Sequence, residues 1–454
     1  MMNQRKLVFS ILGLIVVTVF YYVISGYIET TEQITKSKQK VNAQLTEIEA
    51  NGFSISDRGI QKENEHFVIR LDDPQKASVF LTQKGIQVQL EEAEELKGLQ
   101  LGIDLTYIND TIALELYPVV LPTNLKTVLM QEKDQNILVH IEEMLKRKVF
   151  LMHVEIDHSA TTFIGYIKDI SETIAGEKEV KMTLQGFHFS ATMKEEKIIK
   201  LTQTINTMHL YISDMIDRSV SDLQKNYVFT GPTAYDYSTD YSIEKIKIDE
   251  MPDGKLLANN IAFHSTSSVK NGLAVENLHA EIENIDVFFE KEKFGMQSLL
   301  LTMNINNLDV DTFEKLQKVD SNNTKTFDAL VEKLLLNNIH IEVPMLSVDK
   351  ITLQGKEING FSLHSKMDID KSLDFYRYSI NPKYALGKIN AKIELSLSKE
   401  LLTVLKEDPK AMLMYMMYRP KRVEDKRIYN LDLKDGLLNI NGKDLKINGK
   451  TIKF

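Results

Sequence analysis

The chain has 454 residues, of which 43% are hydrophobic and 26% are charged, so it can form one large domain or two to three ordinary ones and is not a disordered chain. Its net charge of −9 argues against a nucleic-acid-binding protein that works by neutralising phosphates. It contains no cysteine, which excludes disulfides, thiolate zinc sites and cysteine nucleophiles.

The N-terminus predicts a membrane anchor. Arg5 and Lys6 precede an uncharged apolar run, Leu7 to Ile24, which is long enough to span the hydrocarbon core of a bilayer. Because the positive charges precede the run, we expect the N-terminus in the cytoplasm and the body across the membrane. A cleaved signal peptide is the alternative, but the bulky tyrosines that end the run make a poor cleavage site. Residues 1–27 are therefore predicted to be a cytoplasmic tip and a transmembrane signal anchor.

Residues 28–52 follow as a polar segment with one apolar stripe. Ile34, Val41, Leu45 and Ile48 fall on one side of a helix, and Asn51-Gly52 is a plausible helix end. This pattern predicts a stalk helix that lifts the body off the membrane. The alternative is that the stripe docks on the body.

The body is predicted to be mostly β with a few helices, built as a large antiparallel, meandering sheet. Apolar residues alternate with polar ones from Leu99 to Leu116, across a turn at Asn109-Asp110, and the same pattern recurs in later segments. The segment 197–220 fits a helix or a strand, and its threonine-rich centre favours a strand. We expect two β-rich halves, 53–230 and 231–454, with the turn-rich segment 226–242 as a long loop or boundary. The apolar strand faces could close as a sandwich or curl into an open groove.

Helices are predicted by apolar stripes at residues 137–145 and 327–335, and by capping signals elsewhere. Asp311, with Glu314 three residues later, has the spacing of a capping box. Asp408-Pro409 is typical of an N-cap followed by the first residue of a helix. At the C-terminus, Asp435-Gly436, Asn441-Gly442 and Asn448-Gly449 are predicted to be two-residue hairpin turns of a closing meander.

The order of these features resembles the YdgA-like family of bacterial proteins of unknown function. The features that match are the short basic N-terminus, one spanning segment, a polar helix, β-rich repeats, "MNINNLDVDTFEKLQKV", a helix opening "SKELLTVL", and the ending "YNLDLKDGLLNINGKDL". The resemblance implies an inner-membrane-anchored protein whose body faces the periplasm, and it supplies no catalytic or binding residues. The β-rich body also resembles AsmA-like proteins, which are linked to moving envelope lipids, although a shared fold alone does not establish function.

No catalytic motif is present, since the chain has no H-E-x-x-H, G-x-S-x-G, P-loop or dinucleotide fingerprint. We therefore expect no enzymatic activity, no cofactor and no metal. The densest cluster is "HVEIDH", where His153, Glu155 and Asp157 would share one face of a strand. That face could hold a metal, but it is more simply the wet side of a strand whose Val154 and Ile156 are buried.

Two segments suggest surface chemistry. Asn322 matches the N-glycosylation pattern N-x-[ST], with an acidic residue two positions earlier. The segment 411–422 joins apolar side chains to basic ones, and Met412, Met416, Tyr418 and Arg419 are the candidates for lipid contact. A core-packed helix with a basic end is the alternative for that segment.

The sequence therefore favours a non-enzymatic periplasmic scaffold or binding module anchored in the inner membrane. The alternative function is a lipid-binding or lipid-trafficking protein with an apolar β-groove. A hydrolase with unrecognised residues is a third and weaker hypothesis.

Overall fold

The computed structural model describes residues 33–83, 88–108, 111–131, 136–157, 159, 161–176, 178–194, 197–233, 235–250, 254–289, 292–317, 324–335, 337–373, 387–447 and 450–451. The predicted anchor, Leu7 to Ile24, lies outside these ranges. Within them, no helix combines the length and the apolar character that a membrane crossing requires.

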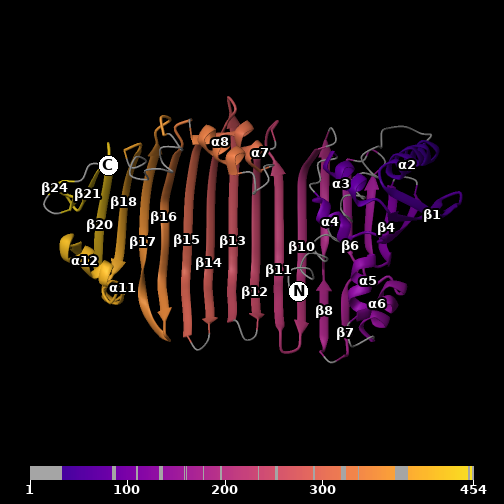
Figure 1. The fold of residues 1–454 in the computed structure, drawn as a ribbon, viewed down its shortest axis with the longest axis horizontal. Coiled ribbons are helices and arrows are strands. Elements are labelled where there is room, and N and C mark those ends of the chain that lie inside the picture. The colour runs from indigo at the N-terminus through magenta and orange to yellow at the C-terminus, as the bar shows by residue number, and fades with distance from the viewer. Residues whose placement is uncertain are drawn as a thin grey trace. The chain divides into compact units, whose positions relative to one another are not determined.

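The protein is mostly β with few helices, and its strands form a large antiparallel sheet, as predicted (Figure 1). The chain divides into two compact units, Met1–Leu223 and Gln224–Phe454, which we call unit 1 and unit 2. The division falls within one long strand, β11 (Ile216–Phe229). Each unit is described by itself below.

Unit 1 contains a sheet of short strands that pair antiparallel in chain order from β1 to β6. β6 then pairs with β9, and the long β10 pairs with β9 through one half and with β8 through the other. The segment 197–220, predicted to be strand, comprises β10, a turn and the start of β11. The strands are β1 (Phe53–Ile60), β2 (Asn64–Leu71), β3 (Gln100–Tyr107), β4 (Thr111–Val120), β5 (Met152–Asp157), β6 (Thr162–Ile167), β7 (Ile170–Ile174), β8 (Val180–Gln185), β9 (His188–Lys194) and β10 (Lys197–Ile212).

Helices cover the apolar side of this sheet. Side chains of α2 (Gln33–Ala50), α3 (Pro74–Gln83) and α4 (Leu90–Glu95) share one buried cluster with residues from seven of the strands. α5 (Thr123–Gln131) and α6 (Asn136–Lys146), the latter at the helix predicted for 137–145, build two smaller clusters beside it. Unit 1 is thus a two-layer arrangement of helices on a sheet.

The polar segment before the body, where it is described, is part of unit 1. Val41, Leu45 and Ile48 of α2 are each at most 3% exposed and lie in the core cluster. The apolar stripe therefore docks on the body over this stretch, as the alternative predicted. Burial of each such side chain contributes roughly 1.5–3 kcal/mol to the free energy of folding.

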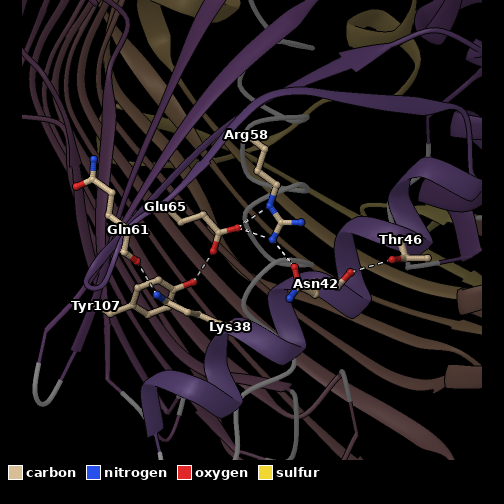
Figure 2. Close-up of polar contacts among 7 residues, drawn as sticks. All are labelled: Lys38, Asn42, Thr46, Arg58, Gln61, Glu65 and Tyr107. Atoms are coloured by element: carbon tan, nitrogen blue, oxygen red, sulfur yellow. Dashed lines mark hydrogen bonds and ion pairs between the residues drawn. The ribbon is translucent and has the colours of Figure 1, made fainter.

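A polar cluster beside the apolar stripe links α2 to the β1–β2 hairpin (Figure 2). The fully buried carboxylate of Glu65 accepts hydrogen bonds from Arg58 Nη2 at 2.6 Å and from the Tyr107 hydroxyl at 3.0 Å. Arg58 also donates to the Asn42 side chain on α2, and Lys38 Nζ donates to the carbonyl of Gln61 at 2.7 Å. A buried charge needs such partners, because an unpaired carboxylate in an apolar surrounding is strongly disfavoured.

Unit 2 is dominated by long strands that pair antiparallel in chain order from β12 to β18. β20 then pairs with β18, β19 and β21, and β21 pairs with β22. These strands are β12 (Tyr237–Glu250), β13 (Gly254–Lys270), β14 (Leu273–Phe289), β15 (Glu292–Asp309), β16 (His340–Leu353), β17 (Lys356–Ile369), β18 (Ile389–Ser398), β19 (Lys421–Val423), β20 (Lys426–Lys434), β21 (Leu437–Ile440) and β22 (Lys443–Asp444), with β23 (Lys446–Ile447) and β24 (Lys450–Thr451) forming a separate pair.

One predicted connection is much shorter than expected. The segment 226–242, predicted as a long loop or boundary, is mostly strand, and only residues 230–236 connect β11 to β12. The long-loop interpretation is wrong, because the tyrosines that alternate with polar residues there belong to strand faces. The boundary interpretation is close, since the two units divide at Leu223, three residues before the segment. Asp236 organises the short connection, since its carboxylate accepts from the backbone N–H groups of Thr233 and Val269.

Four helices are described in unit 2: α7 (Val310–Gln317), α8 (Thr324–Leu335), α11 (Lys399–Leu405) and α12 (Pro409–Met417). Asp408 caps α12 with Pro409 at its first position, as predicted. The capping prediction for Asp311 is wrong. Asp309 accepts from the Thr312 N–H at 2.8 Å, whereas Asp311 lies in the first turn and pairs with Lys315.

The closing meander is confirmed where it is described. Asp435 and Gly436 have φ of 50° and 77°, and Asn441 and Gly442 have φ of 52° and 81°. Positive φ at both central residues is the signature of the tight hairpin turn predicted here. Asn448-Gly449 lies outside the described residues.

Candidate functional site

The sheet of unit 2 has one apolar face and one polar face. Residues directly opposite on neighbouring strands share a face, and apolar residues face apolar residues from strand to strand. Ile282 on β14, for example, lies opposite Ile261 on β13 and Leu299 on β15. The pattern continues through Leu346 opposite Leu363 and through Leu363 opposite Leu395.

Charged and polar side chains pair across the opposite face. Lys366 lies 2.8 Å from Glu342 on the neighbouring strand, and His340 lies 2.7 Å from Asp368. His264 and Asp240 form a further cross-strand pair at 2.7 Å. Such exposed pairs contribute little to stability, but they identify this side of the sheet as the one that faces water.

A row of interruptions crosses the sheet and shifts the alternation by one residue on six successive strands. Asn260 and Ser298 in this row have positive φ, and the Asn260 amide donates to Glu283 beside it. On either side of the row, apolar residues recur three positions apart and stay on one face. These pairs are Ile243 and Ile246, Ala258 and Ile261, Ile282 and Ile285, Met296 and Leu299, Val348 and Ile351, and Ile358 and Phe361.

Described helices pack on the apolar face at the two ends of the strands (Figure 1). Near one end, Leu401 and Leu402 of α11 pack with Val348, Ile351 and Leu397 in one buried cluster. At the other end, Leu335 of α8 packs beside Ile369 and Leu373. These clusters leave the centre of the face between them.

The central part of the face, which we call the open apolar face, carries large side chains that are only half-buried. None of them belongs to a buried cluster in the part of the chain that the structure describes. A sheet buried on both sides would have fully buried residues at these positions. The open apolar face comprises Leu256, Ile261, Phe263, Leu278, Ile282, Ile285, Leu301, Met303, Leu346, Leu363 and Ile393.

The predicted lipid-contact residues lie on α12 and just after it. Met412 and Met416 are 39% and 64% exposed, and Arg419 is also exposed. Tyr418 is 4% exposed, so it holds the end of the helix rather than presenting a contact surface. No residue of α12 is buried, and Tyr415 packs against the buried cluster of α11, so the core-packed alternative applies to one side of the helix only.

Basic side chains lie near Tyr415 of α12, whereas Asp408 caps the start of the helix. The Lys406 ammonium lies 3.5 Å from the centroid of the Tyr415 ring. Its hydrogen bond and its charge, with a further contribution from Arg422, lower the pKa of the Tyr415 hydroxyl. A lowered tyrosine pKa reports a locally positive environment, which would also favour an anionic ligand.

The other predicted candidates are the cluster of His153, Glu155 and Asp157 and the glycosylation site at Asn322. Val154 and Ile156 are buried, and His153 lies 3.4 Å from Glu155 on the wet face of β5 while its ring stacks on Tyr166. Among the described residues, no group of three or more histidines and carboxylates has metal-binding geometry. Asn322 lies outside the described residues.

Two features of this site are absent from the sequence-based prediction. The interruption row was not recognised, although the repeated three-residue spacing of apolar residues signals it. The exposed aromatic tip between β14 and β15, with Phe289 61% exposed, was also missed.

Comparison with protein-family models, with curated proteins and with solved structures finds no match to this chain. The resemblance to the YdgA-like family therefore stays a prediction from the motifs quoted above.

Proposed function

We propose that this chain is a non-enzymatic envelope protein, anchored in the inner membrane by Leu7 to Ile24, whose unit 2 binds the acyl chains of lipids on its open apolar face. The observation that carries the proposal is that face: a continuous set of large apolar side chains on a sheet whose described helices pack only near its two ends. The N-terminal apolar run supports the membrane location.

The chemistry of the face suits a flexible hydrocarbon ligand. Each methylene group that leaves water contributes about 0.8 kcal/mol, and an extended acyl chain can contact successive strands without a preformed pocket. Leucine, isoleucine, phenylalanine and methionine supply no hydrogen bonds, so selectivity for one acyl chain over another would be low. Such a binding module is the specific form that we propose for the expected periplasmic scaffold, and a lipid-trafficking role is its natural use.

Site-specific photo-crosslinking of the full chain in its membrane tests the proposal. Leu363 lies on the open apolar face, and Ser362, its neighbour on β17, lies on the polar face. Each is replaced in turn by p-benzoylphenylalanine, the cells are irradiated, and the purified chain is analysed by intact mass spectrometry. We expect lipid adducts at position 363 and none at position 362.

The other outcomes reject the proposal in distinguishable ways. Protein adducts confined to position 363 would show that a protein partner covers the face, which favours a scaffold. Equal lipid adducts at both positions, or none at either, would show that the face has no preference for lipid. Circular dichroism of both variants confirms that the sheet is intact before the adducts are compared.

A further inference from the structure

We propose that α12, together with the basic residues that follow it, docks unit 2 on an anionic lipid surface. This inference rests on the proposed function, because such a surface would supply or receive the lipid bound on the open apolar face. It adds a place of contact that is separate from that face.

The exposure of α12 is the first observation. Leu413 and Met416 are 58% and 64% exposed, and Met412, Met414 and Met417 are exposed as well. Successive helical residues are 100° apart, so these five positions cover an arc of about 200° around the helix. Tyr415 lies on the remaining side and packs against the buried cluster of α11. A protein groove would contact a narrower stripe of such a helix, whereas a helix that lies in a lipid interface buries a broad apolar face.

The charge around α12 is the second observation. The segment from Pro409 to Arg422 carries four basic residues and no acidic ones, in a chain whose net charge is −9. Arg419, Lys421 and Arg422 are clustered at its end and are not engaged in any described ion pair at 4 Å or less. Methionine next to clustered cations is the composition of interfacial segments that bind anionic headgroups.

An aromatic hairpin tip at the same end of the strands is the third observation. Phe288 and Phe294, at the ends of β14 and β15, are each 38% exposed, and Phe289 between them is 61% exposed. Phe294 lies opposite Leu353, which packs against the cluster formed by α11. The hairpin tip and the α11–α12 helices therefore belong to one end of unit 2 (Figure 1).

A local fluorescent probe tests the docking directly. The chain contains no cysteine, so Met416→Cys can carry a single environment-sensitive dye, and Lys392→Cys on the exposed polar face serves as the matched control. The full chain is reconstituted into phosphatidylcholine vesicles with or without phosphatidylglycerol. A second population of empty vesicles is added, so that contact with either membrane is registered.

We expect a blue shift of the dye at position 416 in the presence of phosphatidylglycerol and no shift at position 392. Reversal of three charges in Arg419→Glu, Lys421→Glu and Arg422→Glu should weaken the contact about 100-fold, since each basic residue near an anionic surface contributes roughly fivefold. If the emission of the dye at position 416 shows no blue shift with any vesicle composition, the inference is wrong.

The probe also separates docking from acyl-chain binding. If docking fails while lipid adducts form at position 363, lipid reaches the open apolar face by another route and only the docking is wrong. If the dye reports docking while position 363 gives no lipid adduct, the proposed function is wrong and α12 is only a membrane contact.

Discussion

The apolar face of the sheet is covered to a different extent in the two units. Ten of the eleven largest fully buried side chains in the described residues belong to unit 1, and Ile440 is the exception. Both units contain antiparallel strands with apolar residues on one face, but helices cover that face throughout much of unit 1 and pack near the ends of the strands in unit 2.

The order of elements along the chain explains the difference. In unit 1, α3 and α4 lie between β2 and β3, and α5 and α6 lie between β4 and β5, so helices are available to fold back on the sheet. In unit 2, β12 to β15 follow one another from Tyr237 to Asp309, and the described residues of this range contain no helix. An alternating strand pattern shows which face is apolar, and the neighbouring elements determine what covers it.

Charge insertion at matched positions should give the largest effect. Leu114 in unit 1 is 1% exposed, and Leu301 in unit 2 lies half-buried on the open apolar face. Leu114→Asp should cost more than about 4 kcal/mol and unfold unit 1, because it buries an unpaired carboxylate. Leu301→Asp should lower the free energy of unfolding by about 1–2 kcal/mol, because the carboxylate on this half-exposed face stays hydrated.

Hydrogen-exchange mass spectrometry of the full chain measures both effects and assigns them to a unit. Thr302→Asp, on the polar face of the same strand, controls for the loss of strand propensity. Equal destabilisation by Leu114→Asp and Leu301→Asp would show that the two apolar faces are equally covered, and the contrast between the units would fail.

The buried ion pair of unit 1 should give the next largest effect. Arg58→Met leaves the Glu65 carboxylate buried without its cation and should lower the free energy of unfolding by about 3–5 kcal/mol. Arg70→Met is the matched control, since Arg70 pairs with Asp72 at the surface and should contribute less than about 1 kcal/mol. Urea titration compares the two variants.

A second substitution distinguishes the loss of a charge partner from the loss of packing. The double variant Arg58→Met with Glu65→Gln removes the unpaired charge and should recover a large part of the stability. No recovery would mean that the packing of Arg58 against α2, and not its charge, holds the helix in place.

Local signals in the sequence predicted much of the fold. Alternation predicted β3 and β4, Asp-Gly and Asn-Gly predicted the closing turns, and Asp408-Pro409 predicted the start of α12. These features depend on residues close together in sequence. The interruption row was not predicted, because a strict two-residue period reads each three-residue step as the end of a strand.

The candidate site was predictable only in part, for a different reason. The amino-acid sequence of α12 predicts an apolar helix with a basic end, and both a core-packed helix and an exposed helix fit that pattern. Exposure of Met416 and burial of Tyr418 depend on where α11 and β20 place the helix. The partial exposure of the open apolar face likewise depends on where all the described helices of unit 2 pack.

The interruption row offers a smaller test, confined to the sheet of unit 2. A Cβ at Gly360 would collide with the Val348 carbonyl on the neighbouring strand, so Gly360→Ala should cost about 1–3 kcal/mol. Gly59→Ala in unit 1 is the control, since a Cβ there meets open space and should be nearly neutral. Faster exchange confined to β16 and β17 would support the role of the row, and unchanged exchange would contradict it.

The smallest expected effect concerns pH and the connection to β12. Burial alone would raise the pKa of Asp236, but hydrogen bonds from Thr233 and from the Val269 N–H outweigh it, so the pKa lies below its ordinary value. A carboxyl with a lowered pKa stabilises the fold above the unfolded pKa of about 3.9 and loses that contribution as the pH falls through the folded value. Asp236→Asn should therefore lower the free energy of unfolding by about 1 kcal/mol at neutral pH, and its difference in stability from the unsubstituted chain should become smaller below about pH 4.

Urea titrations across this pH range measure that difference in stability, and Asp240→Asn at the exposed pair with His264 is the control. A constant difference down to the acid limit would show that the charge of Asp236 does not hold the connection.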